Sequence, residues 1–318
     1  MFEKNSRVCF LGDSITTQGK WIARIFDYYS TNLKDNAVTF YNCGVPGGTA
    51  TAAIPRIDED VLSWNPTHVV IMFGMNDGKS ALYQKEVTVT EDILSQRTAQ
   101  ISNCIDSIRI IADKITEFGA KLIFCTPTPF DNLQICDAPH ADYQECLAVI
   151  SEKVKSLSAE YGVQCIDFNT YLLANMKEFQ KADSRFSIVK ADRVHPNAIG
   201  EELMADYFLK EQGFPCVISK SFEQWEAASN IPFSPINKTR FDIEQNLRLI
   251  AYVQWALIPF HQNNGLTAEE GLQKELDNPN TPNFAIDAIH LYQDNKDHME
   301  DFRNKLRKHT DMMVSNLG

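Results

Sequence analysis

A serine, a histidine and an aspartate are spaced along this chain so that together they could hydrolyse an ester. Ser14 follows the apolar run 7–11, which predicts a short buried strand, so its hydroxyl would lie at the carboxyl edge of a sheet, where open α/β sheets bind ligands. A serine hydroxyl is a poor nucleophile at neutral pH and needs a base, which His195 could supply with Asp192 three positions before it. The two segments together indicate serine ester chemistry.

Each segment also has a purely structural interpretation. Gly12-Asp13-Ser14 is a common kind of turn, in which Ser14 would only cap local backbone groups. The segment 192–196 could be a loop that precedes a helix over 198–212, since Asn197 is a favourable N-cap. The chemical interpretation is favoured because both segments occur in one chain and two further motifs lie between them.

The first of these motifs is glycine-rich. Segment 41–49 follows the apolar run 38–41 and contains Gly44, Gly47 and Gly48. Glycines let the backbone turn tightly and present bare N–H groups, which is what holding an oxyanion requires. The alternatives are an ordinary glycine turn and a phosphate-binding loop. No Gly-Lys-Ser/Thr sequence completes a P-loop, so nucleotide binding receives little weight.

The second motif centres on Asn76, directly after a buried strand predicted over 67–73. This position puts Asn76 at the same sheet edge as Ser14, where its side-chain amide could donate a hydrogen bond to a developing negative oxygen. The alternative is an Asx turn that ends the strand.

Four motifs occur in the order Gly-Asp-Ser, Asn-x-x-x-x-Gly, Gly-x-Asn-Asp and Asp-x-x-His-Pro. This ordered set resembles the SGNH (GDSL-type) hydrolases, which are esterases and lipases, over roughly the first two-thirds of the chain. The resemblance implies Ser14 as nucleophile and as one oxyanion N–H donor. It implies that Gly47 donates a second backbone N–H and Asn76 a side-chain N–H. His195 would be the general base, held in the right tautomer by Asp192.

The other residues of these motifs receive lesser roles. Gly44 and Gly48 are less favoured as the glycine donor, because the five-residue step from Asn42 does not reach them. Asp13 and Asp77 are assigned structural roles in their turns.

Two-step acyl transfer of this kind needs no metal and no cofactor. Cys136, His140 and Cys146 could be imagined as metal ligands, but no motif joins them, so we expect none.

Apolar runs typical of strands alternate with stretches of helical periodicity: strands at 7–11, 38–41, 67–73, 121–125 and 162–167, and helices at 21–29, 101–118, 141–161 and 198–212. Such alternation predicts an α/β fold with a parallel sheet and helices on both faces. The resemblance implies a flavodoxin-like three-layer α/β/α arrangement with a five-stranded parallel sheet. One edge of that sheet would gather the separated site residues.

Beyond about residue 216 the strand signals end. We expect residues 1–215 to form the hydrolase domain and residues 216–318 to form a helical extension packed against it. Helical periodicity covers 241–258 and 283–306, the latter as one helix or two, and Pro259 is expected to break a helix. A substrate-capping element, or an arm that joins two copies into a homo-oligomer, is the functional alternative.

Two loops could shape the site. Segments 79–90 and 127–139 follow predicted strands at the same edge, and each could be a lid over a pocket or only a connection.

Charge and composition disfavour several classes of partner. A formal net charge of −12 disfavours nucleic acid and anionic membranes, and no apolar stretch is long enough to span a bilayer. No secretion signal precedes the first strand, and the eight cysteines are scattered, often within apolar runs. We therefore expect a cytoplasmic protein whose partner is a small-molecule ester.

Three functions follow in order of preference. The first is a serine carboxylic-ester hydrolase that removes short, acetyl-like acyl groups from a sugar or another small ester. The second is a lysophospholipase-like or thioesterase-like lipid hydrolase. The third is a non-catalytic ligand-binding protein on the same fold, which the presence of both a base and its orienting aspartate disfavours.

Overall fold

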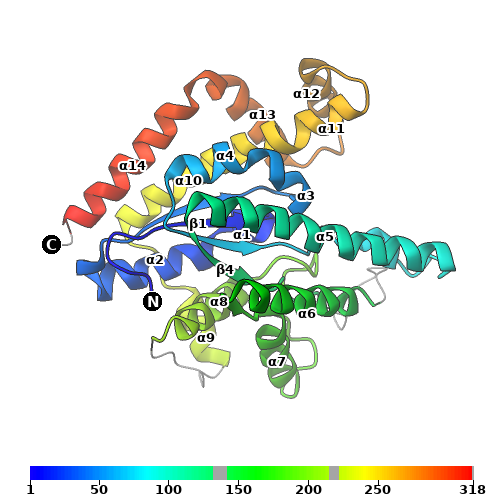
Figure 1. Ribbon diagram of the computed structural model, residues 1–318, viewed down its shortest axis with the longest axis horizontal. Helices are drawn as coiled ribbons and strands as arrows, with labels where there is room; N and C mark the ends of the chain where they lie inside the picture. Colours follow the sequence, from blue (N-terminus) through cyan, green and yellow to red (C-terminus); the bar gives the residue numbers. More distant parts are fainter. Residues whose placement is uncertain (132–141, 215–221, 317–318) are drawn as a thin grey trace.

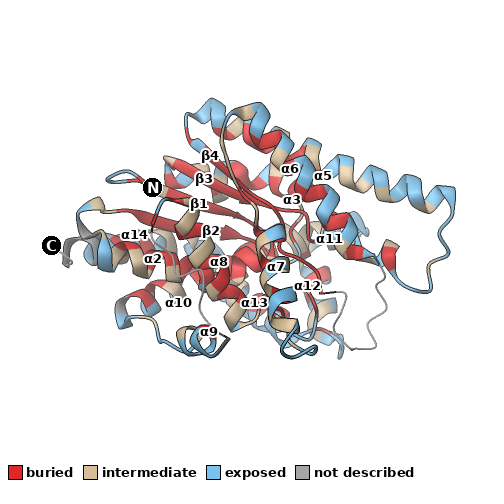
Figure 2. Cartoon of the chain, turned by 90° about the horizontal axis from the view of Figure 1, so that it is seen from below, coloured by how far each residue is buried: buried red, intermediate tan, exposed pale blue. Residues whose placement is uncertain are grey.

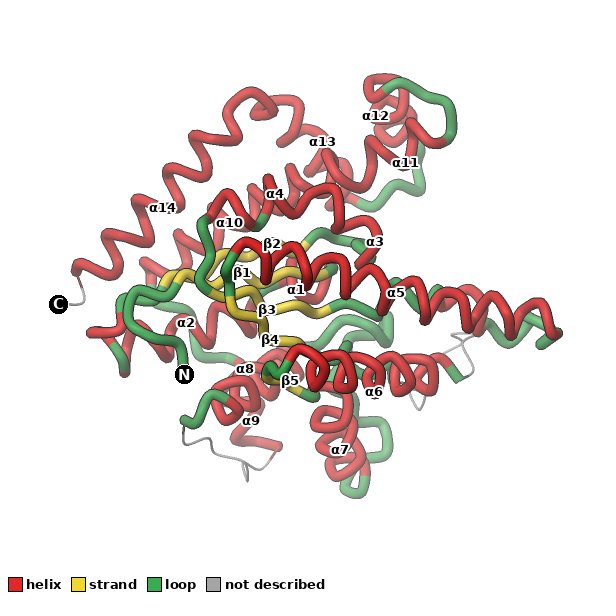
Figure 3. Tube along the Cα trace, viewed as in Figure 1, coloured by secondary structure: helices red, strands yellow, loops and turns green. Residues whose placement is uncertain are grey.

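Five parallel strands form one sheet at the centre of the molecule, in the order β2-β1-β3-β4-β5 (Figures 1 and 3). The computed structural model describes residues 1–131, 142–214 and 222–316. The strands are β1 (Arg7–Gly12), β2 (Thr39–Gly44), β3 (His68–Met72), β4 (Lys121–Cys125) and β5 (Gln164–Ile166). The expected five-stranded parallel sheet is confirmed, with every strand within a few residues of its predicted place.

The register brings three strand ends to one level. Gly12, the last residue of β1, is paired with Gly44 of β2 on one side and with Met72 of β3 on the other. The segments that follow these three strands therefore leave the sheet at the same carboxyl edge. The interior of β1 is buried throughout, as expected for a parallel strand covered on both faces.

Helices cover both faces, which gives the expected three layers (Figure 2). On one face lie α2 (Lys20–Asn32) and α8 (Ala198–Glu211), which pack against each other; on the other lie α5 (Glu91–Phe118) and α6 (Tyr143–Tyr161). Among the helices that connect these elements are α1 (Ser14–Gln18), α3 (Ala50–Ala53), α4 (Ile57–Asp60) and α7 (Phe168–Gln180).

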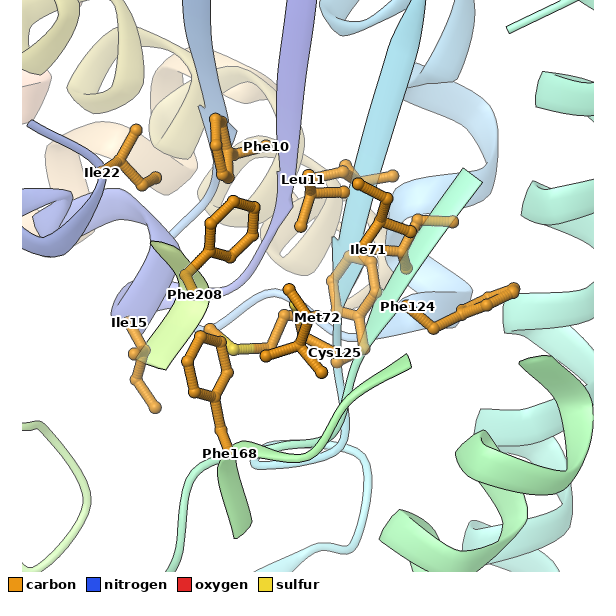
Figure 4. Close-up of a cluster of buried hydrophobic side chains, with 14 of the residues drawn as sticks. Phe10, Leu11, Ile15, Ile22, Ile71, Met72, Phe124, Cys125, Phe168 and Phe208 are labelled. Carbon is orange, nitrogen blue, oxygen red and sulfur yellow. The ribbon is translucent and has the colours of Figure 1, made fainter. Parts of the chain in front are cut away.

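Aromatic side chains fill the space between the sheet and the α2–α8 layer (Figure 4). Phe10 of β1 makes edge-to-face contact with Trp21 of α2 and also packs against Phe208 of α8. Contacts of this kind add about 0.5–1.5 kcal/mol per pair beyond the burial of apolar area. This packing anchors the first strand, which leads directly to Ser14.

The C-terminal helices are α9 (Phe222–Ser229), α10 (Pro235–Tyr252), α11 (Ile258–Asn263), α12 (Ala268–Asp277), α13 (Asn283–Asn295) and α14 (Met299–Asn316). Of these helices, α10 packs against the edge of the sheet formed by β2, whereas α9 packs against α8. Helix α10 contacts β2, and Arg240 of α10 donates a hydrogen bond to the carbonyl of Phe40. Leu247 and Leu306 join the main hydrophobic core, while a smaller cluster around Val253 holds the outer helices together. The extension is thus helical and packed as expected, whereas the division at residue 215 stays a prediction.

The expected break at Pro259 is wrong. A π-helical turn, Val253–Leu257, joins α10 to α11 without an interruption. Proline lacks the N–H that would bond to the carbonyl four residues earlier, and a widened turn accommodates that missing bond. Pro235, by contrast, is the first residue of α10, a position where the missing N–H costs nothing.

Helix α5 begins ten residues before its predicted apolar stripe and projects beyond the sheet (Figure 1). Its first turns are mostly exposed, so they carry no buried stripe that could reveal them. Thr90 caps the helix by accepting a hydrogen bond from the N–H of Ile93. Segment 79–90 forms a short 3-10 helix, Ser80–Tyr83, fastened to α5 by a 2.7 Å hydrogen bond from Arg97 to the carbonyl of Leu82, followed by an exposed connection.

No helix among the described residues is long and apolar enough to cross a membrane. Six cysteines lie in the described part of the chain and all are free thiols, five of them buried.

Candidate active site

Ser14 is the first residue of helix α1, directly after the end of β1. Asp13 caps this helix: its carboxylate accepts a 2.9 Å hydrogen bond from the N–H of Ile15, and its carbonyl accepts another from Thr17. The N–H of the first helical residue has no partner within a helix, so the Ser14 N–H is left available at the sheet edge. The sequence predicted a loop here, and the five-residue helix was missed.

His195 reaches Ser14 from a loop between α7 and α8. Its Nε2 lies 2.7 Å from the Ser14 Oγ, and its Nδ1 lies 2.7 Å from the Asp192 Oδ2. The loop is closed by a bridge between Val189 and Pro196 and by a 2.8 Å hydrogen bond from the N–H of Lys190 to the carbonyl of His195. The three side chains thus form one continuous hydrogen-bonded chain.

The Asp192 carboxylate is held in its charged form. Its Oδ1 accepts backbone N–H bonds from Val194 and His195, both 2.9 Å long. Partial burial acts to raise the pKa of Asp192, but these hydrogen bonds and the His195 ring outweigh it and leave the pKa below its ordinary value. With the carboxylate ionised, Nδ1 of His195 must carry the proton, so Nε2 is free to accept one from Ser14.

The backbone of Arg193 forms the turn in this loop, a structural role that the sequence did not predict. The residue adopts the left-handed conformation with φ of 67° while only 4% of its surface is exposed. Its N–H bonds to the carbonyl of Lys190, and its own carbonyl accepts a 3.3 Å bond from the N–H of Asp131. The left-handed conformation costs a non-glycine residue roughly 1–2 kcal/mol, so this turn is maintained by its surroundings. The Asp-x-x-His motif gives the spacing of Asp192 and His195 but does not predict the left-handed conformation of Arg193 between them.

Segment 127–131, the start of the second candidate lid, packs beneath the same loop. All five residues are buried, and the Phe130 N–H donates a 2.7 Å hydrogen bond to Gln144 of α6. Residues 132–139 of the predicted segment lie outside the described residues.

Gly47 lies on an exposed turn after β2. The N–H of Gly48 bonds to the carbonyl of Val45 at 3.0 Å, with Pro46 second and Gly47 third in the turn at φ of 70°. Proline followed by a positive-φ glycine is typical of a type II turn. Within the described residues the Gly47 N–H has no acceptor, whereas the N–H of Gly44 bonds to Asn42. Of the three glycines considered, Gly47 is therefore the one whose N–H is available to donate to an oxyanion.

Asn76 is fixed against this turn. Its side-chain Nδ2 donates a 2.9 Å hydrogen bond to the carbonyl of Gly48. An amide group has two N–H donors, so this bond orients the group and leaves one donor for a ligand. Gly48 in turn packs on the nucleophile segment, because a Cβ added to it would lie 3.8 Å from the Asp13 Cα.

Asp77 ties the two donor segments together. One carboxylate oxygen accepts the N–H of Ala50 at 2.8 Å, at the start of α3, and the other accepts the N–H of Gly74 at 3.0 Å, after β3. Burial raises the pKa of Asp77, and burial together with the nearby Asp77 charge raises that of Asp13 to about 7. Both aspartates bond to backbone groups, as their predicted structural roles require.

Among the residues that the structure describes, no group of three or more His, Cys, Asp and Glu side chains could hold a metal ion. Cys136 and His140, two of the three imagined ligands, lie outside the described residues; Cys146 is buried.

Comparisons with known proteins identify the family of this chain. Residues 10–203 match the profile of a family described as GDSL-like lipase/acylhydrolase. The acetylxylan esterase of Geobacillus stearothermophilus is 21% identical over 229 residues, which cover 67% of this chain and 97% of that protein.

Solved structures share the fold. A gut microbial diltiazem-metabolizing enzyme superposes over 100% of this chain and 95% of its own, with a TM-score of 0.80 at 20% identity. The acetyl xylan esterase AlAXEase covers 64% of this chain and 98% of its own, with a TM-score of 0.53 at 23% identity. The first of these similarities extends over the C-terminal helices as well as the sheet.

Proposed function

The chain belongs to the GDSL-like lipase/acylhydrolase family and is a carboxylic-ester hydrolase; from this premise we propose that it removes short acyl groups, such as acetyl, with Ser14, His195 and Asp192 as its catalytic residues. The observation that carries the proposal is the chain of two 2.7 Å hydrogen bonds from Ser14 through His195 to Asp192. A ligand-binding protein would have no use for a base and its orienting carboxylate in this alignment.

The first step forms an acyl-enzyme. Nε2 of His195 takes the proton from Ser14 as Oγ attacks the ester carbonyl. The carbonyl oxygen becomes negative, and the N–H groups of Ser14 and Gly47 and the side-chain amide of Asn76 donate to it. His195 then passes its proton to the departing alcohol.

The second step releases the acid. Water gives a proton to His195 as it attacks the acyl-enzyme, and the same three donors hold the oxyanion. The proton returns to Ser14 when the bond to Oγ breaks. Asp192 stays ionised throughout and stabilises the imidazolium, consistent with its lowered pKa.

Two observations favour a short-acyl, sugar-linked substrate. Two relatives are acetylxylan esterases by name, although their identity to this chain is 21–23%. The formal net charge of −12 also disfavours work at an anionic lipid surface. A small acetylated carbohydrate is the substrate that fits both observations.

Hydrolysis of p-nitrophenyl esters from acetate to palmitate tests the proposal, with acetate release from acetylated xylo-oligosaccharides measured in parallel. We expect fastest turnover of the shortest esters and none by Ser14→Ala. A maximum at long chains would keep the mechanism but overturn the short-acyl assignment. Activity that survives in Ser14→Ala would overturn the catalytic assignment, and labelling of Ser14 by a fluorophosphonate provides an independent check.

A further inference from the structure

A buried arginine without hydrogen-bond partners lies between the sheet and the C-terminal helices. Arg248 of α10 is 1% exposed, and its Nε, Nη1 and Nη2 all lack a hydrogen-bond partner. A guanidinium carries five N–H donors, and leaving buried donors of a charged group unpaired is costly. Such a group is normally matched by a carboxylate, a phosphate or another anion.

The protein supplies only half of a counter-charge for this arginine. Glu244 is the nearest carboxylate, with Oε2 3.6 Å from Nη1 of Arg248, which is too far for a hydrogen bond. The same carboxylate forms a 2.7 Å bond with Arg240 through Oε1. One buried negative charge is therefore shared between two buried positive charges.

The opposite wall adds no spare negative charge. Asp60 bonds to Arg56 at 2.9 Å and also faces Arg303 of α14, which in turn pairs with Glu59 at 3.4 Å. The neighbouring ion pairs thus join Arg56, Arg240 and Arg303 to Asp60, Glu244 and Glu59, and no carboxylate among them reaches Arg248 at hydrogen-bond distance. At the rim, Glu300 pairs with both Arg303 and Arg307.

A cleft opens at this point. It is lined by the end of β2 (residues 41–44), by Trp64, and by Arg248 and Arg303 from two different helices. Two carboxylates also line it, Asp60 and Glu244, and each is paired with another arginine. The cleft is narrow: its cavity volume is about 30 Å³, which is room for roughly two water-sized groups, such as the two oxygens of a carboxylate. Burial lowers the pKa of Arg248 to about 10, so the side chain is still cationic at neutral pH.

We propose that this cleft binds a small oxyanion, a carboxylate or phosphate group, through Arg248 with Arg303 on the facing wall. The planar guanidinium fork matches the paired oxygens of such groups, which spherical anions do not offer. A bound oxyanion would accept hydrogen bonds from the unpaired donors of Arg248 and connect α10, α14 and the end of β2. The site is separate from Ser14 and does not depend on the proposed catalytic roles.

Thermal unfolding of the full chain tests the site, because a ligand that binds only the folded state raises Tm as its concentration increases. Tm is measured against inorganic phosphate and against acetate, with sodium chloride holding the ionic strength constant. We expect a saturable rise of roughly 2–4 °C with at least one oxyanion. The oxyanion that reaches half of the rise at the lower concentration identifies the preferred group.

Arg248→Met, which keeps much of the side-chain volume without the charge, should abolish the rise. Arg185→Met, at an exposed arginine whose one ion pair among the described residues is with Asp183, should leave it intact. If Arg248→Met does not fold, Arg303→Met takes its place, and a shift of its half-saturation to higher oxyanion concentration would support the site. Equal responses of the wild type and the cleft variant, or no response of the wild type to either oxyanion, would overturn the proposal.

Discussion

The Oγ of Ser14 and the Nε2 of His195 lie 2.7 Å apart although 181 positions separate them in the chain. The first residue stands at the end of β1 and the second in the loop before α8, so the distance depends on the whole sheet and on the α2–α8 layer. If the pair acts as a unit, Ser14→Ala should lower kcat by on the order of 10⁴–10⁶-fold with short p-nitrophenyl esters. The double variant Ser14→Ala/His195→Ala should lose no more than Ser14→Ala alone, whereas additive losses would show that the two act separately.

Asp192→Asn should lower kcat by on the order of 10³–10⁴-fold with little change in KM. The amide cannot hold Nδ1 in the protonated tautomer as a carboxylate does, so Nε2 is no longer available to accept the serine proton. Asp183→Asn, at an exposed carboxylate paired only with Arg185, is the matched control and should keep full activity. Similar losses in both variants would point to a general charge effect.

Asn76→Ala should lower kcat about 100- to 1000-fold, since one oxyanion donor is removed. It should also lower the free energy of unfolding by about 1 kcal/mol, because the carbonyl of Gly48 loses its 2.9 Å hydrogen bond. Steady-state kinetics and urea unfolding separate the two effects. A variant that loses stability while keeping its kcat would remove Asn76 from the oxyanion hole.

Gly47→Ala and Gly162→Ala form a matched pair. Both glycines have positive φ, 70° and 65°, and an added Cβ would meet nothing within 4 Å in either place. Each substitution should cost about 1–2 kcal/mol of stability through backbone strain. Only Gly47→Ala should lower kcat, by about 10- to 100-fold, because it disturbs a donor beside the reacting carbonyl. Equal kcat values in the two variants would argue against Gly47 as a donor.

Glu201→Gln should change how stability depends on pH. Burial raises the pKa of Glu201 from 4.5 to about 7, and its Oε2 accepts the N–H of Trp21. Between those pH values the folded state binds more protons than the unfolded state, so this group makes stability fall as pH rises, and the loss is complete above pH 7. The free energy of unfolding of the variant, compared with that of the wild type, should therefore be about 2–3 kcal/mol higher at pH 8 than at pH 5. Urea unfolding at both pH values measures this; a constant difference would contradict it.

The strands and the motifs could be predicted from the sequence because they depend on local residue patterns. β4 begins and ends at the predicted residues, since an apolar run bounded by Gly119 and Pro127 leaves no other choice. Helix α1 could not be predicted from the sequence, because its five residues are stabilised by hydrogen bonds from residues far away in the chain. Asn42 of β2 donates to the carbonyl of Thr16, and Gln245 of α10 donates to that of Gln18.

The buried polar face of α10 shows a second limit of sequence patterns. Arg240, Glu244 and Arg248 recur every four residues, which is typical of a solvated salt-bridge face. In the structure all three are buried against β2. Periodicity identified the apolar side of this helix, but it could not reveal that the helix is covered on its charged side as well.

The hydrogen bond from Arg240 to the carbonyl of Phe40 has a consequence for self-association. β2 ends the sheet, and an uncovered terminal strand offers its backbone to any other chain, which promotes aggregation. Helix α10 closes that side with a charged residue in place of another strand. Helix α10 therefore protects this edge of the sheet from pairing with a strand of another molecule, whether or not the C-terminal helices contact a substrate.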